Sequence, residues 1–312
     1  MSEKESELFR QLEQLATEQR NPNTFSIDVA DAHEIAKSIN VEDQKVAGFV
    51  EQRIPVIASA IDRVAAAFAV GGRLLYFGAG TSGRLGVLDA AECPPTFGTP
   101  PEQVVGYIAG GKEAMFAAQE GAEDSEDRGK EDVEHAEVTS IDVVCGIAAS
   151  GRTPYVHGAI KEGIHRNCNT MLITTVPADQ VTIEPGLMID IPVGPEVIMG
   201  STRMKSATAQ KMVLNMLTTG AMIRQGKIYE NVMVDLMLTN SKLVERAKRI
   251  VMYFSTVGYR EASDLLEQTN GKVKPALFMA ITGLNLKDAV RCLTKTNGFI
   301  RKALQEYNSD SL

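Results

Sequence analysis

The chain has 312 residues and a formal net charge of −8 at pH 7, which argues against a binding surface for nucleic acid or for an anionic membrane. Tryptophan is absent and aromatic residues make up only 5% of the chain, so the stacking platforms of a single-strand binder are missing. No apolar run approaches the length of a membrane span, and the N-terminus is too charged for a signal peptide. We therefore expect a cytoplasmic protein that binds neither nucleic acid nor membrane.

Cysteine and histidine residues are scattered along the chain. Cys93, Cys145, Cys168 and Cys292 show neither the spacing of a zinc site nor that of a redox pair. The four histidines show no ligand spacing either. We expect no metal and no organic cofactor.

Residues 1–60 are predicted to form an N-terminal helical arm. Leucines recur at helical spacing over residues 8–15, until residues 20–23 break the pattern. Further helical stretches are expected at residues 28–39 and 46–69, the second interrupted at a proline. We interpret these helices as packing elements or as an arm that contributes to a dimer.

From Arg73 onward the pattern changes to strand, glycine turn and helix. Strands are predicted at residues 74–77, 104–109, 143–148, 170–175 and 188–193. Helices are predicted at residues 85–91, 112–122, 155–165, around Asp179, and at 204–223. Continuously apolar strands that alternate with helices indicate an α/β fold, a doubly wound parallel sheet with helices on both faces. We assign residues 61–226 to this domain, whose ligand should lie at the carboxyl ends of the strands.

After Gly226 the rhythm of strands and glycines stops. Residues 232–253 are predicted to form a helix, and turn residues then separate several short helical runs. These turns are at residues 269–271, 283 and 297–298. Residues 227–312 are therefore expected to be a helical region with a small C-terminal helical domain.

The first predicted strand leads into a glycine turn, residues 78–84, that we call the first turn. Gly78, Gly80 and Gly83 make it too tight for side chains, and a helix follows. Such a turn aims backbone N–H groups and a helix dipole at an anion, and Thr81 and Ser82 add two hydroxyl donors. The sequence predicts a binding site for a phosphate.

The same glycines spell the dinucleotide motif G-x-G-x-x-G. That function needs an acidic residue at the tip of the second strand, and the second strand here ends in Gly110, Gly111 and Lys112. No Gly-Lys-Ser/Thr follows the glycines, so a P-loop is excluded as well. A site for a monophosphate fits better than a nicotinamide site.

A second turn, residues 148–154, follows the third predicted strand and repeats the chemistry of the first. Ser150 and Thr153 supply hydroxyls, and Gly151 allows the backbone to approach a ligand closely. Two such turns at strand ends of one sheet are better explained by a shared oxyanion than by helix capping alone. Arg84 and Arg152 fit two roles, pairing with the phosphate or with a neighbouring acid.

Two acidic residues follow these elements. Glu92 is expected to end a helix just before two prolines, a position that the helix dipole disfavours for an acid. Glu123 is expected at the end of the helix after the second strand. Two carboxylates beside one phosphate site suggest a general acid and a general base.

Eight blocks of the sequence resemble the N-acetylmuramic acid 6-phosphate etherase family, and together they extend over nearly the whole chain. The blocks are residues 78–86, 91–96, 121–125, 147–155, 17–22, 200–205, 208–217 and 298–304. The resemblance implies a sugar-isomerase (SIS) domain, a small C-terminal helical domain and a homodimer whose subunits share active sites.

The resemblance also implies an activity and its residues. The family cleaves the D-lactyl ether of a sugar phosphate, N-acetylmuramic acid 6-phosphate, without a cofactor, and yields N-acetylglucosamine 6-phosphate and D-lactate in cell-wall sugar recycling. Its catalytic glutamates correspond to Glu92, which we expect to protonate the lactate oxygen, and Glu123, which we expect to take the C2 proton. Beside Thr81, Ser82, Gly83, Arg84, Ser150, Gly151, Arg152 and Thr153, we expect Glu196, Ser201 and Arg203 to bind substrate.

Two other functions use the same features. An aldose–ketose isomerase would need the phosphate site and a base, but no acid for a leaving group. A non-catalytic sugar-phosphate sensor of the glucokinase regulatory kind would need the phosphate site alone. The presence of both Glu92 and Glu123 favours the etherase.

Overall fold

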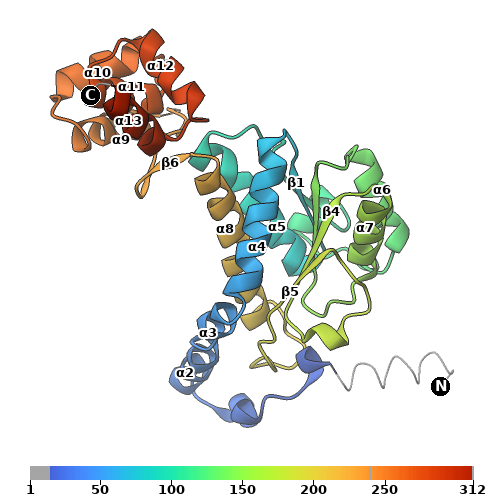
Figure 1. Cartoon of the computed structure of the whole chain (residues 1–312). Coiled ribbons are helices and arrows are strands. Elements are labelled where there is room, and N and C mark those ends of the chain that lie inside the picture. Colours follow the sequence, from blue (N-terminus) through green and yellow to red (C-terminus); the bar gives the residue numbers. More distant parts are fainter. Residues whose placement is uncertain (1–14, 239, 311–312) are drawn as a thin grey trace. The chain divides into compact units, whose positions relative to one another are not determined.

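The structure is a computed structural model that describes residues 15–238 and 240–310 (Figure 1). The chain divides into two units, the first comprising residues up to 91 together with 102–218, and the second comprising 92–101 and the residues from 219 onward. The predicted leucine pattern at residues 8–12 lies outside the described residues. Among the described residues, no helix is long and apolar enough to cross a membrane.

The first unit contains a five-stranded parallel sheet whose strand order is β2-β1-β3-β4-β5. The strands are β1 (Leu74–Gly78), β2 (Val104–Ile108), β3 (Val143–Ile147), β4 (Asn169–Thr174) and β5 (Leu187–Asp190). All five predicted strands are confirmed to within a few residues. The predicted doubly wound fold is confirmed as well.

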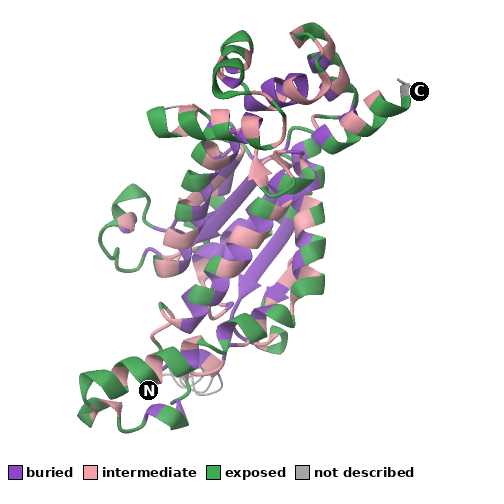
Figure 2. Ribbon diagram, turned by 90° about the vertical axis from the view of Figure 1, so that its left-hand side faces the viewer, coloured by how far each residue is buried: buried purple, intermediate pink, exposed green. Residues whose placement is uncertain are grey.

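Helices cover both faces of the sheet, as Figure 1 shows. One face carries α6 (Glu126–His135) and α7 (Pro154–His165); the other carries α4 (Ile54–Ala69), α5 (Gly80–Phe97) and α8 (Lys205–Arg224). Every residue of β1 and β3 is buried between these layers (Figure 2). The sequence pattern missed α6, whose residues are mostly charged.

A buried polar network ties β1, α5 and α8 together. The carboxylate of Asp89, on α5, accepts hydrogen bonds from Tyr76 Oη at 3.1 Å, Asn215 Nδ2 at 2.8 Å and Thr218 Oγ1 at 3.2 Å. Burial raises the pKa of Asp89, and these hydrogen bonds only partly counter that effect. The network fixes α8 against the sheet. The helix predicted at residues 204–223 is thereby confirmed, since α8 covers nearly the same residues.

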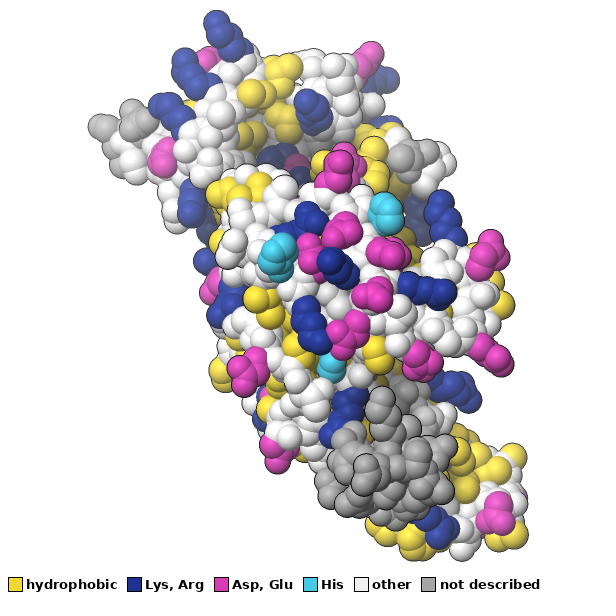
Figure 3. All heavy atoms as spheres, turned by 90° about the vertical axis from the view of Figure 1, so that its right-hand side faces the viewer, with side chains coloured by type: hydrophobic (Ala, Val, Ile, Leu, Met, Phe, Trp, Pro, Cys, Tyr) yellow, Lys and Arg dark blue, Asp and Glu magenta, His cyan; other side chains and the backbone are white. Residues whose placement is uncertain are grey.

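Helices α6 and α7 pack at contact distance through two glycines. A Cβ atom on Gly129 would lie 1.9 Å from the Tyr155 carbonyl oxygen, and one on Gly158 would lie 1.8 Å from that of Glu126. On the outer surface of this layer, acidic and basic side chains are interspersed (Figure 3), and Lys161 pairs with Glu126 at 2.6 Å. This face is a solvated one.

The N-terminal residues form short helices. They are η1 (Ala16–Glu18), η2 (Pro22–Thr24), η3 (Ile27–Val29), α2 (Ala32–Asp43) and α3 (Val46–Glu51). The helix predicted at residues 28–39 begins later because Asp31 caps it, accepting the backbone N–H of Glu34 at 2.8 Å. The break predicted at Pro55 falls instead at residues 52–53, since a proline fits the first turn of α4.

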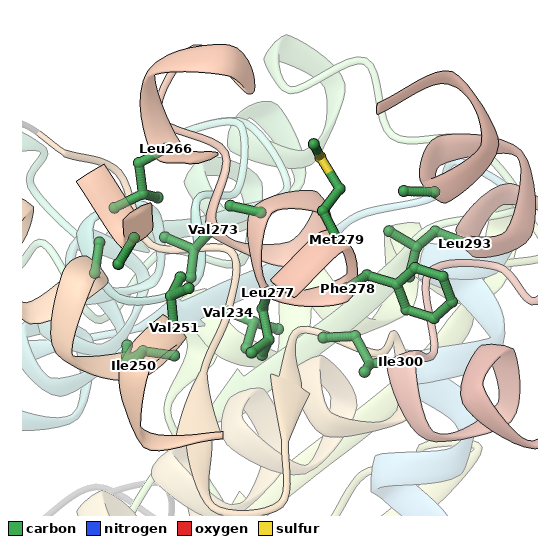
Figure 4. Close-up of a cluster of buried hydrophobic side chains, with 14 of the residues drawn as sticks. Val234, Ile250, Val251, Leu266, Val273, Leu277, Phe278, Met279, Leu293 and Ile300 are labelled. Carbon is green, nitrogen blue, oxygen red and sulfur yellow. The ribbon is translucent and has the colours of Figure 1, made fainter. Parts of the chain in front are cut away.

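The second unit is mainly helical. A hairpin of β6 (Ile228–Tyr229) and β7 (Val232–Met233) precedes α9 (Ser241–Tyr253), α10 (Tyr259–Gln268), α11 (Val273–Thr282), α12 (Leu286–Lys295) and α13 (Ile300–Asp310). Its core gathers Val251, Val273, Leu277, Phe278 and Ile300 (Figure 4). The predicted separations of the last helices at 269–271, 283 and 297–298 are confirmed.

The helix predicted at residues 232–253 is wrong in its first half. Val232 and Met233 pair in the hairpin, and α9 starts only at Ser241. The Asn240 side chain accepts the N–H of Leu243 at 2.9 Å, which caps the helix there.

We expect Gly158→Ala to destabilise the first unit, because its new methyl group would collide with the backbone of α6. Overpacking of this kind costs about 1–3 kcal/mol of unfolding free energy. Gly48→Ala is the matched control, since Gly48 is also helical and has nothing within 4 Å of its Cβ position. It should raise the unfolding free energy by about 0.5–1 kcal/mol. Equal effects in urea titrations would contradict the prediction.

Candidate functional site

The two predicted turns face one pocket of about 560 Å³ in the first unit. The first turn contributes Gly80, Thr81 and Ser82 to its lining. The second turn contributes Ser150, Arg152, Thr153 and Pro154, and Glu123 lines the same pocket. Six of the thirteen predicted site residues therefore line this pocket. The others do not line it: Glu92, Gly83, Arg84, Gly151, Glu196, Ser201 and Arg203.

The strand order explains why these turns meet. β1 and β3 are hydrogen-bonded neighbours, but the chain leaves β1 toward β2 and leaves β3 toward β4. Ligands of doubly wound sheets bind at such a switch of direction, outside the carboxyl ends of the strands. The first residues of α5, α6 and α7 all line the pocket, so three helix N-termini face it and favour an anion there.

The glycines of the first turn let α5 start directly after β1. A Cβ atom on Gly83 would lie 2.6 Å from the Gly78 carbonyl oxygen and 2.7 Å from the Ile108 side chain. Gly80 has a positive φ of 52°. Gly83 is thus required for the close approach of helix and strand, and it brings the backbone of Thr81 and Ser82 to the pocket.

The second turn is held by side chains from neighbouring elements. The Ala149 carbonyl accepts hydrogen bonds from Thr174 Oγ1 and Thr175 Oγ1, both at 3.1 Å. His157 Nε2 donates to the Gly151 carbonyl at 2.8 Å, and Gly151 has a φ of 68°. His157 also lines the pocket, and the sequence pattern had not singled it out.

Ser82 is buried and already has a protein partner. Its hydroxyl donates to the Oε1 atom of Gln210, on α8, at 2.9 Å. Ser150 is less buried, and its Oγ accepts the backbone N–H of Arg152 at 3.3 Å. The two serines thus enter the pocket from different walls.

The two arginines differ in their surroundings. The Arg84 guanidinium donates to the carbonyls of Met115 at 3.0 Å and Ala114 at 2.6 Å. Arg152 lines the pocket, and its Nε donates to the Gln180 carbonyl at 3.1 Å, beside the short helix η5 (Ala178–Gln180). Arg84 therefore anchors a loop, whereas Arg152 stands at the pocket.

Arg84 also explains why the helix predicted at residues 112–122 is wrong. Residues 112–122 form only η4 (Lys112–Met115) followed by loop. The carbonyls of Ala114 and Met115, which a longer helix would use, accept from Arg84 instead. Glu123 consequently lies in a loop rather than at a helix end, with an exposed side chain.

Glu92 does not end a helix either. α5 continues through Pro94 and Pro95 to Phe97, and the Pro94 carbonyl accepts the N–H of Gly98 at 2.9 Å. Each proline lacks an N–H, so the helix forgoes the hydrogen bonds to the carbonyls four residues earlier, those of Ala90 and Ala91. The Glu92 side chain is exposed on α5.

Glu196, Ser201 and Arg203 come from the segment before α8. Glu196 is fully buried, and its carboxylate accepts the backbone N–H groups of Lys205 at 3.0 Å and Ser206 at 2.9 Å. It therefore caps α8. Among the described residues, the neighbours Gly200 and Thr202 line the pocket rather than Ser201 or Arg203.

The N-terminal segment forms another wall of the pocket, which the sequence pattern did not predict. Leu15, Thr17 and Glu18 line it. The Thr17 carbonyl accepts the N–H of Gly200 at 3.0 Å, and Thr24 Oγ1 donates to the Val197 carbonyl at 2.8 Å. The one sign of this wall in the sequence is that residues 17–22 form one of the blocks that resemble the etherase family.

A buried ion pair joins this segment to α8. Lys205 Nζ lies 2.7 Å from Glu42 Oε2, and both side chains are at most 3% exposed. Burial alone would raise the pKa of Glu42, but hydrogen bonds from Lys205, Lys45 and Asn23 outweigh it and lower the pKa from 4.5 to about 2. The pair fixes α2 against the start of α8.

Among the described residues, no group of three or more histidine, cysteine or acidic side chains could hold a metal ion.

The doubly wound sheet and the pocket at its switch of direction define the class, an SIS-type α/β domain. The model of the Glucokinase regulatory protein N-terminal SIS domain family matches residues 56–163. Two solved phosphoheptose isomerases are similar in structure. GmhA from Neisseria gonorrhoeae has a TM-score of 0.45 and is 15% identical, covering 61% of this chain and 98% of that one. The enzyme from Francisella tularensis has a TM-score of 0.42 and is 12% identical, covering 62% and 98%.

Curated relatives match almost the full length. The N-acetylmuramic acid 6-phosphate etherase of Salinibacter ruber is 53% identical over 96% of this chain and 97% of the relative. N-acetylmuramic acid 6-phosphate etherase 2 of Vibrio cholerae is 49% identical over 96% and 98%, and the Clostridium beijerinckii protein is 51% identical over 96% and 98%. The chain belongs to the N-acetylmuramic acid 6-phosphate etherase family.

We expect the Glu42–Lys205 pair to make stability depend on acid. Since the folded pKa of Glu42, about 2, lies below its ordinary value of 4.5, the pair contributes fully above pH 4.5 and is lost as pH falls toward 2. The difference corresponds to about 3 kcal/mol of unfolding free energy. Glu42→Gln should remove that amount at pH 7 and flatten the decline of the melting temperature below pH 4.5.

The matched control is Glu134→Gln. Glu134 pairs with Lys130 at 3.7 Å on the surface, where such a pair contributes about 0.5 kcal/mol or less. An unchanged acid profile in Glu42→Gln would contradict the assignment.

Proposed function

We propose that the protein cleaves the D-lactyl ether of N-acetylmuramic acid 6-phosphate, giving N-acetylglucosamine 6-phosphate and D-lactate in cell-wall sugar recycling in the cytoplasm. The observation that carries the proposal is 53% identity to a curated etherase over 97% of that relative. The pocket supports it, because two hydroxyl turns and three helix N-termini suit a phosphate.

The chemistry suits a pair of carboxylates. An ether at C3 of the sugar is a poor leaving group for direct displacement. Opening the ring frees the C1 aldehyde, which acidifies the C2 proton. One carboxylate takes that proton, and a second protonates the lactate oxygen as the C3–O bond breaks. Water then adds its hydroxyl to C3 and a proton returns to C2, which balances the reaction as a hydrolysis.

The phosphate would lie between the two turns. Thr81 and Ser82 would donate from one side, Ser150 and Thr153 from the other, and the N–H groups at the start of α5 would complete the set. Glu123 lines the same pocket, which suits its role as the base at C2. Glu92 is the acid for the lactate oxygen in this scheme.

We further propose that the protein works as a homodimer with shared active sites. Large apolar side chains of the N-terminal segment and α2 are exposed in the single chain: Phe25 is 56%, Val29 80% and Val41 46% exposed. Ile198 and Met199, beside the pocket segment, are 51% and 55% exposed. An apolar surface of this kind is typical of a subunit interface.

The direct test is to offer N-acetylmuramic acid 6-phosphate and to measure D-lactate. Release of lactate supports the etherase. Ketose formation from an aldose phosphate without lactate would favour an isomerase, and binding without turnover would favour a sensor. Either of these outcomes would overturn the proposal.

We expect Ser82→Ala and Ser150→Ala each to weaken binding of N-acetylglucosamine 6-phosphate. A lost hydrogen bond to a charged group costs about 1–3 kcal/mol. Calorimetric titration measures the effect, with unphosphorylated N-acetylglucosamine as the control ligand. If both variants bind the phosphorylated sugar normally, the phosphate lies elsewhere.

We expect the two glutamates to separate in an exchange experiment. Glu92→Gln keeps the shape of the side chain but cannot deliver a proton, so lactate release should fall by about 10²–10⁴-fold. Because proton abstraction precedes departure, the variant should still exchange the C2 hydrogen with deuterated water, as NMR would show. Glu123→Gln should lose both activities. Exchange that survives in Glu123→Gln and vanishes in Glu92→Gln would reverse the roles.

We expect sedimentation at assay concentration to show a dimer. Val29→Asp places a charge on the exposed apolar surface and should shift the protein toward monomer with loss of activity. Lys130→Asp, on the charged outer surface of α6, is the control and should leave the dimer intact. An active monomer would contradict the shared site.

A further inference from the structure

The contact between Ser82 and Gln210 contains an unused hydrogen-bond donor. Gln210 is 1% exposed, and its Oε1 accepts the Ser82 hydroxyl at 2.9 Å. Its Nε2 has no hydrogen-bond partner among the described residues. A buried amide nitrogen without a partner is costly, so its presence calls for a physical reason.

The same contact conflicts with phosphate binding. Ser82 lines the pocket but has one hydroxyl proton, which it donates to Gln210. Phosphate oxygens only accept hydrogen bonds. In this arrangement the Ser82 hydroxyl therefore has no proton to offer a phosphate.

Rotating the Gln210 amide by half a turn frees the serine proton and gives Nε2 an acceptor, and it moves Oε1 to the position where Nε2 has no partner. Nε2 then takes the position of Oε1 and donates to Ser82 Oγ, so that the serine proton is released toward the pocket. The exchange needs no backbone movement, because the two ends of the amide have nearly the same size. We propose that Gln210 is a positioning residue that turns the Ser82 proton onto the phosphate when the substrate binds. This inference rests on the proposed function, which puts a sugar phosphate in the pocket.

The surroundings on α8 suit this role. Ser206, one helical turn before Gln210 and therefore on the same face, is fully buried, and its Oγ also has no partner among the described residues. Its hydroxyl is a donor for an acceptor on that face. A glutamine is needed because it both accepts and donates; a carboxylate could only hold the serine proton.

The test is a double-mutant cycle measured as the dissociation constant for N-acetylglucosamine 6-phosphate. Gln210→Met keeps the volume and removes both the amide acceptor and the amide donor, so that nothing orients the Ser82 hydroxyl toward the phosphate, and it should raise the constant about tenfold. In a Ser82→Ala background the same change should have no further effect, because Gln210 acts through Ser82. With N-acetylmuramic acid 6-phosphate, Gln210→Met should raise KM and leave kcat nearly unchanged.

Gln210→Glu provides a second variant in case Met disturbs packing. Its carboxylate keeps the serine proton, so the dissociation constant should rise at least as much as in Ser82→Ala. Asn215→Leu is the matched control, since it removes an amide of α8 that donates to Asp89 and not to Ser82. It should lower stability and leave the constant unchanged.

The outcomes distinguish a failure of the positioning role of Gln210 from a failure of the proposed function. If the wild-type protein releases lactate and Gln210→Met binds like it, the positioning role is wrong and the proposed function stands. If Gln210→Met raises the constant equally with and without Ser82, its role is structural and the inference is wrong. If the wild-type protein neither binds the phosphorylated sugar nor releases lactate, both fail together.

Discussion

The adjacency of β1 and β3 is the constraint on which the pocket depends. Two parallel neighbours end at the same edge of the sheet, and the chain leaves them in opposite directions, so both turns can open toward one space. α5 must then start at once after β1, and only a glycine at position 83 permits this, because a Cβ there would meet the Gly78 carbonyl at 2.6 Å. The glycine spacing of a dinucleotide motif thus serves here to bring a helix N-terminus to a strand end.

Buried polar contacts outside the pocket hold its walls in place. Glu196 caps α8, Asp89 ties its middle to α5, and Lys205 pairs with Glu42. Each of these contacts would leave a buried charge or donor unpaired if one partner were lost, which is more costly than the gain from forming it. The segment around Glu196 therefore supports the site by holding α8, and the pocket itself is reached by its neighbours Gly200 and Thr202.

Local signals in the sequence predicted the sheet and both turns, because buried apolar runs bounded by glycines depend on neighbouring residues alone. Contacts between distant residues explain the failures. The carbonyls of residues 114 and 115 go to Arg84, so the predicted helix stops at η4. The wall formed by Thr17 depends on a hydrogen bond to Gly200, which no local pattern announces. The two-residue strands of the β6–β7 hairpin are too short for a periodicity.

The charges around the pocket suggest why its phosphate donors would be mostly neutral. Glu18, Glu123, Asp124 and Glu126 line it, and Arg152, the one arginine or lysine among the described lining residues, already gives its Nε to a carbonyl. A lysine or a second arginine beside the phosphate would also pair with these carboxylates, lowering the pKa of any acid that must hold a proton for the leaving group. Backbone N–H groups at helix starts carry only a partial positive charge, and serine or threonine hydroxyls carry none, so they bind a dianion with a smaller effect on the pKa of that acid. Neutral donors would therefore allow phosphate binding and proton transfer to operate in the same pocket under the proposed function.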